Sequence, residues 1–434
     1  MSRYRLPRSL PLLCALCLTG CATHSESFRA VEKNLANQQP RQALEVLDKQ
    51  KGARVDEVLY LLNRAMLLRI AGDYRASTES FELAQRRMEA LSALSLREQG
   101  TSFIINDSTR SYVGEPFEQV MVPVYKALNY LQLGDRDGAR VEALQIDLKL
   151  RAAEGRHLGE AFARYLTGII YEDLGEWSDA MIAYRKAYEG YRKNSSEYRV
   201  DVPGFLKEDL LRLASMLDLK DELEKYHQEF AVQNKQGETL GDPPNAPESE
   251  LIFVLNNGLA PAKRENSVAM MAPSRVGAGL MRISLPYFES RVPSVSKMHI
   301  RLEDRGIAAE RVENIDAIAS ATLSEQIPAI TARSMARVVA KRQIAMQIGR
   351  NNKNDALAVM ADVIGFITEQ ADTRSWSTLP HDIHLARFPL SAGSYTVKIE
   401  LRDRGDNIVA TREFHDVLIQ KGKKTYLSYH WINL

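Results

Sequence analysis

Cysteine is scarce in this chain, and its scarcity excludes two kinds of site. The 434-residue sequence has three cysteines, Cys14, Cys17 and Cys21. A disulfide and a cysteine-based metal site each need at least two thiols. The first two cysteines lie in an N-terminal segment that we expect to be removed, which leaves one thiol. We therefore expect neither a disulfide nor a thiolate metal site in the mature protein.

Three other features are missing or weak. The formal net charge is only +1, from 57 basic and 56 acidic side chains, so no charge excess points to nucleic acid. After the N-terminal segment, no run reaches the roughly 18 apolar residues that a membrane span needs. The motifs G-x-S-x-G and H-E-x-x-H and the phosphate-binding loop are absent. We therefore expect a protein that binds no nucleic acid, needs no cofactor and is not an enzyme.

The N-terminus has the features of an export signal. Residues 1–8 carry three arginines, residues 10–18 are apolar, and the two residues before Cys21 are small. This order is typical of a signal peptide, and the apolar part is too short to span a bilayer. The sequence L-T-G-C at residues 18–21 resembles the bacterial lipobox, in which the cysteine after the cleavage site is acylated. An ordinary signal peptide with an incidental cysteine is the alternative.

The lipobox resemblance implies where the protein resides. Residues 1–20 would be removed, Cys21 would carry acyl chains, and residues 21–30 would form a tether to the membrane. Each buried CH₂ contributes about 0.8 kcal/mol, so several chains make a lasting anchor. An aspartate after the acylated cysteine retains enteric lipoproteins in the inner membrane, and here Ala22 and Thr23 follow instead. We therefore expect the periplasmic face of the outer membrane.

Residues 31–235 are expected to form helices arranged as repeats. In the best copy, small and aromatic residues recur at fixed offsets; these are Gly168, Tyr171, Gly175, Trp177, Ala180, Tyr184 and Ala187. Small residues at 168 and 180 let two helices approach closely, and a glycine at 175 suits the positive φ of a turn. The pattern resembles the tetratricopeptide repeat, a helix–turn–helix unit of about 34 residues. A generic helical bundle is the alternative.

Further copies place turns at Gly72, at Gly134 and, in a degenerate form, at Gln38. Gln38 and Gly72 are 34 residues apart, which is one repeat. Between Gly72 and Gly134, an insertion at about residues 100–116 interrupts the helical periodicity. Its apolar residues 103–105 are expected either to pack on the repeats or to form part of a partner-binding surface. Stacked hairpins form a curved solenoid, and we expect its concave face to bind a protein partner.

Residues 236–249 are rich in proline, glycine and acidic side chains, and this composition predicts a linker. Residues 250–434 are expected to form a β-rich domain. The apolar run at residues 251–255 predicts a buried strand, and turn signals at 404–407 and 421–424 separate the last strands. These strands are expected to form an antiparallel meander in a small β-sandwich. The fold class is therefore α+β, with an α-solenoid followed by a β-sandwich-like domain.

A helical insertion is expected at about residues 312–371, within the β-rich domain. It should be a pair of helices, with a break at Pro328. Arg333, Arg337 and Lys341 recur every four residues and so share one face of the first helix. They are expected to form a solvated row or, in the sharper interpretation, to contact lipid headgroups or anionic cell-wall polymer.

One cluster of residues in the second half has the chemistry of a metal site. His381 and His384 are close in sequence, and Asp372 and Asp382 lie near them. Imidazole and carboxylate groups are ligands for zinc, so this region is the candidate centre of an envelope hydrolase. Surface residues at the start of a strand are the simpler interpretation, and we expect no metal.

Partner binding is assigned to aromatic and charged residues of the repeats, of the 100–116 insertion and of one segment of the second half. They are Tyr112, Glu115, Tyr171, Trp177, Tyr184, Arg374 and Trp376. Trp376 is expected to anchor the helical insertion to the sandwich, with Arg374 pairing locally, or else to stack on a ligand.

Four stretches of the sequence resemble a group of bacterial envelope lipoproteins that have the same two halves. They are Y-V-G-E at 112–115, N-G-L-A-P-A-K at 257–263, S-L-P-Y at 284–287 and D-T-R-S-W-S-T-L-P at 372–380. Related architectures include lipoproteins that activate peptidoglycan synthases and lipoproteins that scaffold polysaccharide export. The resemblance implies a lipid-anchored scaffold or activator that binds envelope proteins through its repeats. Peptidoglycan or carbohydrate binding is the alternative.

Overall fold

The computed structural model describes residues 28–50, 56–97, 110–152, 159–233, 248–274, 277–351 and 370–433. Four predicted features lie outside these ranges: the acylated Cys21, the apolar residues 103–105, most of the linker, and the second helix of the insertion. Among the described helices, none combines the length and the apolar character that crossing a membrane would require.

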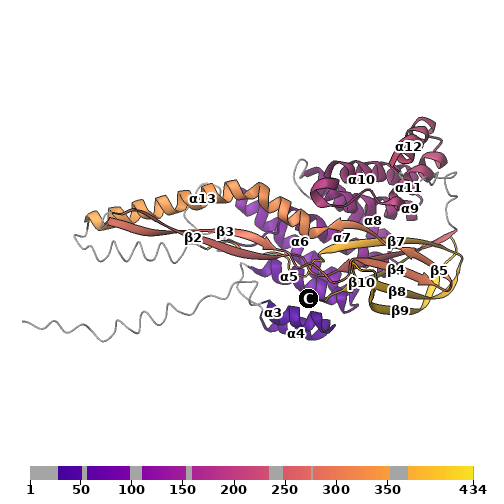
Figure 1. Cartoon of the computed structure of the whole chain (residues 1–434), viewed down its shortest axis with the longest axis horizontal. Coiled ribbons are helices and arrows are strands. Elements are labelled where there is room, and N and C mark those ends of the chain that lie inside the picture. The colour runs from indigo at the N-terminus through magenta and orange to yellow at the C-terminus, as the bar shows by residue number, and fades with distance from the viewer. Residues whose placement is uncertain are drawn as a thin grey trace, which may run out of the picture.

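The first half of the chain consists of helical hairpins, in which each helix contacts the next one along the chain (Figure 1). The helices are α3 (Arg29–Ala36), α4 (Pro40–Lys49), α5 (Glu57–Ile70), α6 (Tyr74–Arg97), α7 (Pro116–Gln132), α8 (Arg136–Ala152), α9 (Glu160–Asp173), α10 (Trp177–Tyr198), α11 (Gly204–Met216) and α12 (Lys220–Gln233). The predicted helical repeat is therefore confirmed.

One turn geometry recurs through the repeats. Gly72, Gly134 and Gly175 have φ of +84°, +73° and +74°, and Gln38 and Asp218 have φ of +57° and +53°. In each of these five turns, the amide of the following residue donates to the carbonyl five positions earlier, at 2.8 or 2.9 Å. This is the hydrogen-bond pattern of a left-handed helix C-cap. The sequence located four of the turns and missed the fifth, at Asp218.

A close approach between two helices explains the small residue at Gly168. A Cβ atom built on Gly168 of α9 would lie 2.3 Å from Cδ1 of Tyr184 on α10, which is far inside van der Waals contact. Tyr184 is fully buried, so close packing prevents its ring from moving aside to make room for a Cβ atom. The predicted role of Gly168 is therefore confirmed.

Within the described ranges, the second half contains two four-stranded sheets and one two-stranded sheet. The first sheet has the order β10 (Lys424–Trp431), β1 (Ser249–Asn257), β7 (Asp382–Leu390) and β6 (Glu310–Asn314). The second has the order β5 (Arg305–Ala308), β4 (Lys297–Leu302), β8 (Gly393–Arg402) and β9 (Ile408–Ile419). The third pairs β2 (Ala262–Ser274) with β3 (Gly277–Glu289). The predicted buried strand is β1, whose nine residues are all buried.

The predicted antiparallel meander is wrong at its last strand. β8 and β9 pair as an antiparallel hairpin, but β10 crosses to the first sheet and pairs in parallel with β1. A turn signal in the sequence indicates where a strand begins. The strand with which it pairs depends on which other strand in the fold has an unpaired edge. Strands β1, β7 and β10 share one apolar cluster with β4, β8 and β9. A complete β-sandwich stays a prediction.

The predicted break at Pro328 is wrong, whereas the second predicted helix of the insertion lies outside the described residues. Helix α13 (Ile315–Asn351) runs through Pro328 without a break. Proline removes the hydrogen bond to the carbonyl four residues earlier, here that of Ser324. Both Pro328 and Ser324 are exposed, so water can satisfy that carbonyl. Local proline chemistry therefore disfavours the helix without ending it.

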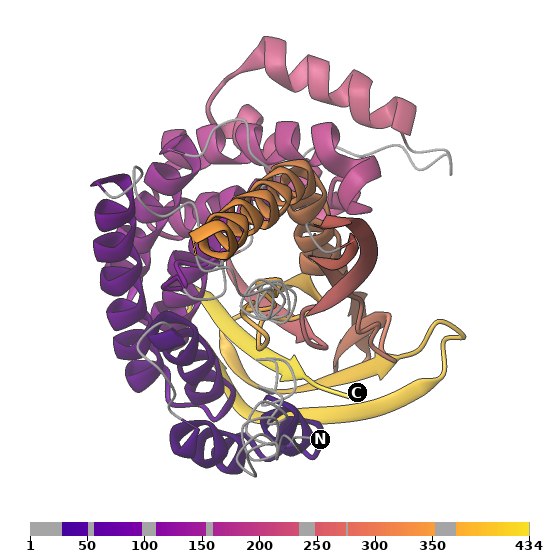
Figure 2. The same cartoon turned by 90° about the vertical axis from the view of Figure 1, so that its left-hand side faces the viewer.

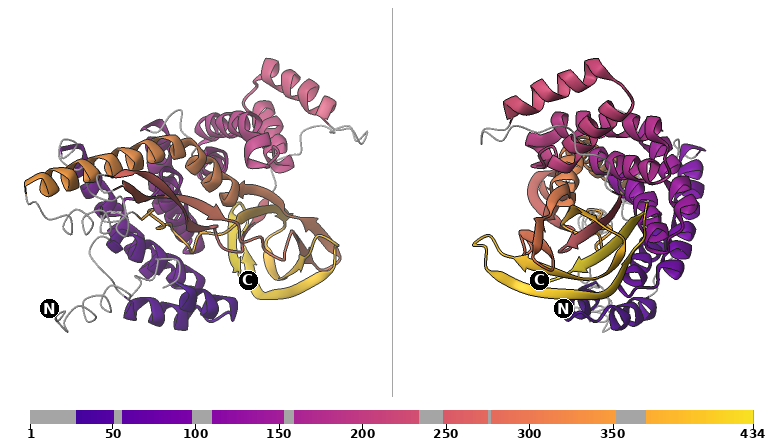
Figure 3. Two further views of the ribbon diagram at one scale, coloured as in Figure 1. Left: turned by 60° about the vertical axis from the view of Figure 1, so that its left-hand side comes forward. Right: turned by 90° about the vertical axis from the view of Figure 1, so that its right-hand side faces the viewer.

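Helix α13 contacts strand β3, and together with β2 they extend away from the rest of the molecule (Figures 1 and 3). We call β2, β3 and α13 the arm. At its base, α13 also contacts α7, α10 and β7.

The helical repeats curve around the sheets (Figure 2). A single apolar cluster contains Phe81 and Tyr125 of the repeats together with Ile252 of β1 and Ile383 of β7. The concave side of the solenoid therefore faces the second half of its own chain.

Candidate functional site

A short loop before β7 enters the inner side of the repeats. We call residues 372–379 the tryptophan loop. Trp376 is only 1% exposed, and its ring makes edge contacts with Phe81 at 5.6 Å and Tyr125 at 6.1 Å between centroids. Its backbone amide donates to Glu118 at 2.7 Å, and its indole N–H donates to Thr378 at 3.0 Å. Trp376 thus joins the sheets to α6 and α7, whereas the sequence placed it between the insertion and the sandwich.

Arg374 holds the other end of the tryptophan loop. Its guanidinium binds Asp372 at 2.7 Å and Asp56 at 3.1 Å, and it donates to the carbonyl of Arg110 at 2.8 Å. It also lies over the ring of Tyr112, 5.5 Å from the centroid. The predicted local pairing with Asp372 is present, but most contacts of Arg374 reach into the repeats.

Glu118 is the buried carboxylate that receives the tryptophan loop. It accepts hydrogen bonds from the amides of Trp376 and Glu115 and from the hydroxyl of Tyr112. Burial and, less strongly, the charge of Glu115 raise the pKa of Glu118 to about 7, although the hydrogen bonds that it accepts act in the opposite direction. Glu118 therefore changes charge near neutral pH inside this junction.

Glu115 connects the repeats to the arm. It is the N-cap of α7 and forms a capping box with Glu118. Its carboxylate binds Lys263 of β2 at 2.7 Å and Gln326 of α13 at 3.1 Å. The first residues of α7 and the base of the arm are therefore held by one side chain.

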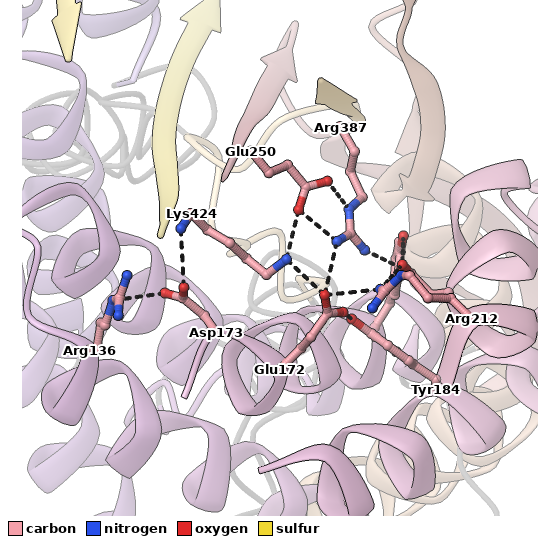
Figure 4. Close-up of polar contacts among 10 residues, drawn as sticks. Arg136, Glu172, Asp173, Tyr184, Arg212, Glu250, Arg387 and Lys424 are labelled. Atoms are coloured by element: carbon pink, nitrogen blue, oxygen red, sulfur yellow. Dashed lines mark hydrogen bonds and ion pairs between the residues drawn. The ribbon is translucent and has the colours of Figure 1, made fainter. Parts of the chain in front are cut away.

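A second junction is a buried network of charges between α9, α11 and the first sheet (Figure 4). Three carboxylates meet three cations, namely Glu172, Asp209 and Glu250 with Arg212, Arg387 and Lys424. Arg387 binds Glu250 at 2.6 Å and lies 3.5 Å from Glu172. Lys424 binds Glu172 at 2.8 Å and Glu250 at 2.7 Å. The network is neutral and links two helices to β1, β7 and β10.

The pKa values within this network follow from burial and pairing. Burial alone would raise the pKa of Glu250, but Arg387 and Lys424 outweigh it and lower the pKa to about 2. Burial likewise opposes the charge of Arg387, yet the three carboxylates hold its pKa well above the ordinary value. Glu250 and Arg387 therefore hold each other in the charged form, and the network joins the two halves of the chain.

Most predicted partner-binding residues lie inside the protein. Tyr112, Tyr171, Tyr184, Arg374 and Trp376 are buried, so none of them is presented to a partner in this structure. Glu115 is mostly buried between α7 and the arm. Trp177 is 36% exposed. Aromatic residues at repeat positions fill the spaces between helices, and this is why the sequence pattern that identified them does not identify a surface.

The predicted basic row on α13 is wrong as a continuous solvated face. Arg333 is exposed, but Arg337 is buried and donates to Ser334 at 3.1 Å. The side chain of Lys341 is outside the described part. Met335 and Val339 are 50% and 52% exposed on the same helix. Helical spacing shows which residues share a face but not which face packs against a neighbour.

The two histidines are buried, contrary to the interpretation as surface residues. His381 and His384 hydrogen-bond to Asp382 at 2.7 and 2.8 Å, and Asp382 also accepts from Asn257 at 3.0 Å. Burial would raise the pKa of Asp382, but the two histidine hydrogen bonds outweigh it and lower the pKa. Asp372 belongs to the tryptophan loop instead. Within the described ranges, no three histidine, cysteine or acidic side chains are placed to hold a metal ion.

Sequence reasoning missed the charged members of both junctions. Glu250 and Arg387 lie in strands whose other residues are almost all buried. A charge within such a strand signals a buried partner, because an unpaired charge is rarely tolerated there. The identity of that partner is not encoded locally.

No protein-family model and no curated protein sequence matches the chain. Solved structures with helical similarity include MamA from Desulfovibrio magneticus RS-1, at 15% identity and a TM-score of 0.30, over 49% of this chain and 97% of that one. The apo form of RapI has 11% identity and a TM-score of 0.36, over 53% and 60%. Aspartyl phosphate phosphatase F from Bacillus subtilis has 12% identity and a TM-score of 0.34, over 53% and 57%.

Proposed function

We propose that the protein is a non-enzymatic, lipid-anchored scaffold or activator on the periplasmic face of the outer membrane. It binds partner proteins of cell-envelope biogenesis, in the peptidoglycan or polysaccharide machinery. The observation that carries the binding role is the arm, which extends from a body whose two halves are fastened together. Its helix exposes the apolar side chains of Met335 and Val339.

We place partner binding on the arm and not on the concave face of the solenoid. The inner side of the repeats contacts Trp376 and the first sheet of the same chain, so a second protein would have to displace them. Val268 of β2 is exposed like Met335 and Val339, so both parts of the arm offer apolar surface. Exposed apolar side chains that gather on one element favour protein contacts.

Photocrosslinking in cells tests the partner site. A photoreactive residue at Met335 should form an adduct with an envelope protein, because this position is exposed on the arm. Leu144 on α8 is a matched control, since it is also an exposed apolar residue on a helix. Adducts from position 144 alone, or from neither position, would contradict partner binding by the arm.

Acylation of Cys21 is tested by fractionation. Cys21→Ser should move the protein from the membrane pellet to the soluble periplasmic fraction, because the anchor loses its sulfur. Mass spectrometry of the wild-type N-terminus should find an acylated cysteine at residue 21. A Cys21→Ser protein that stays in the membrane fraction would count against lipid anchoring.

Carbohydrate or peptidoglycan binding is the second candidate, and one exposed tryptophan favours it. Trp177 lies beside a cleft of about 320 Å³ together with Asp173, Glu248 and Lys423. A tryptophan face next to polar groups suits stacking on a sugar ring. Purified sacculi should retain the wild-type protein and lose Trp177→Ala if this function is correct. Equal retention of both proteins would show that Trp177 does not contribute to peptidoglycan binding.

A further inference from the structure

Arg69 is a buried cation whose partners are neutral. It lies near the end of α5 and is buried. Its guanidinium donates to the side-chain oxygens of Asn129 and of Ser428, the latter at 2.8 Å. It also lies 5.6 Å from the ring centroids of Tyr74 and Tyr125. No carboxylate of the described residues forms an ion pair with it.

Three other buried arginines, on α11, in the tryptophan loop and on β7, show what Arg69 lacks. Arg212, Arg374 and Arg387 each bind at least one carboxylate within ion-pair distance. Removing a charge from water without an opposite charge is costly, so buried cations are normally paired. Burial lowers the pKa of Arg69, as expected for a cation without a counter-ion.

Arg69 lines a cleft between the first repeats and the C-terminal strands. The cleft has a volume of about 290 Å³. Aromatic side chains and hydrogen-bonding groups line it, among them Tyr74, Phe414, Tyr429 and Gln38. The walls combine apolar side chains with polar groups and one cation, a composition that suits a small organic ligand with a charged group.

We propose that this cleft binds a carboxylate, with Arg69 as its counter-ion. Arginine has five N–H donors, of which two are used by Asn129 and Ser428. The remaining donors match the two oxygens of a carboxylate in a forked arrangement. One carboxylate also neutralises one guanidinium, whereas a phosphate dianion would leave excess negative charge. His430, which lines the same cleft, adds no positive charge at neutral pH, because burial lowers its pKa to about 4.

The carboxylate has two possible sources, a small free organic acid or the C-terminus of a peptide. Isothermal titration of the purified chain distinguishes them with benzoate, a tripeptide with a free C-terminus and the same tripeptide amidated. Binding of benzoate identifies a small acid, and binding of the free tripeptide but not of benzoate identifies a peptide terminus. The amidated tripeptide should bind at least tenfold more weakly than the free one. Absence of binding by both benzoate and the free tripeptide would overturn the proposal.

Variants on one helix locate the binding site. Arg69→Gln removes the buried charge and should weaken binding of the successful probe at least tenfold. Arg64→Gln is the matched control, because Arg64 lies on the same helix, is partly exposed and is only 3.6 Å from Asp48. Equal weakening by both variants, or equal binding of inorganic phosphate, would indicate a general charge effect and overturn the proposal.

A second variant keeps the test valid if Arg69→Gln does not fold. Tyr74 is partly exposed at the start of α6, and its ring centroid lies 5.6 Å from the Arg69 guanidinium, so its substitution disturbs the core little. Tyr74→Ala removes one wall of the cleft and should weaken probe binding while the melting transition stays cooperative. Unchanged affinity in a folded Tyr74→Ala protein would place the bound carboxylate elsewhere. The site uses neither the arm nor Cys21, so its failure would leave the proposed scaffold role standing.

Discussion

At the scale of single residues, charges buried between the two halves decide how the protein holds together. Arg387 contacts carboxylates from α9, α11 and β1, and it is buried among them. Such a group is neutral in sum but fragile, because removing one member leaves the others unpaired in a medium of low polarity. The sequence could show that Arg387 is unusual in an apolar strand, but its three partners come from distant parts of the chain.

Arg387→Met should lower the free energy of unfolding by about 3–5 kcal/mol, since three carboxylates would then face only two cations. Urea denaturation followed by circular dichroism measures the change. Lys421→Met is the control, because Lys421 pairs with Glu248 on the surface and is largely exposed. It should leave the urea midpoint unchanged. A midpoint for Arg387→Met equal to that of the control would show that the network does not fasten the halves.

Glu118 gives the molecule a pH dependence of the opposite sign to that of Glu250. Its folded-state pKa of about 7 lies above the ordinary value of 4.5. Protonated Glu118 therefore stabilises the folded state fully below about pH 4.5. This contribution, about 3 kcal/mol, is lost as the pH rises to about 7. For Glu250, whose pKa is lowered to about 2, stabilisation is present above pH 4.5 and is lost as the pH falls.

Glu118→Gln should remove this loss, because glutamine has a similar shape and cannot ionise. Unfolding free energies from urea melts at pH 5 and pH 8 measure the effect in both proteins. The wild type should lose stability relative to Glu118→Gln between these two values. Parallel pH profiles would mean that Glu118 does not titrate in this range.

At the scale of elements, the sequence predicts local structure well and pairing poorly. The repeated spacing of Gly72, Gly134 and Gly175 located the helix ends, because a positive φ is a local requirement. Helix α13 continues through Pro328 because water can reach the carbonyl of Ser324. Strand β10 pairs with β1 because that edge of β1 is available for hydrogen bonding. Neither property is contained in a window of neighbouring residues.

The tryptophan loop is anchored to the repeats by the large buried side chain of Trp376. Trp376→Ala should lower the free energy of unfolding by about 3–5 kcal/mol, because it empties a site between α6, α7 and the sheets. Trp177→Ala is the matched control, since Trp177 is partly exposed at the start of α10. Thermal melts followed by circular dichroism compare the two variants. Similar melting temperatures for both would show that Trp376 is not an anchor.

At the scale of the whole molecule, the helical repeats and the sheets form one body from which the arm extends. Three of the four sequence stretches that carry the lipoprotein resemblance, at 112–115, 257–263 and 372–380, meet in this body. Glu115 binds Lys263, the amide of Ala260 donates to the carbonyl of Leu379, and Trp376 lies on the repeats. The sequence identified these stretches, but their meeting is a long-range property that periodicity could not predict.

Hydrogen exchange tests most directly whether the two halves are one body. Exchange measured by mass spectrometry on wild type and Trp376→Ala reports each element separately. If the inner side of the repeats is filled by its own chain, the substitution should speed exchange in α5, α6 and α7 as well as in β1 and β7. Faster exchange confined to residues 370–390, with α5 to α7 unchanged, would contradict the account.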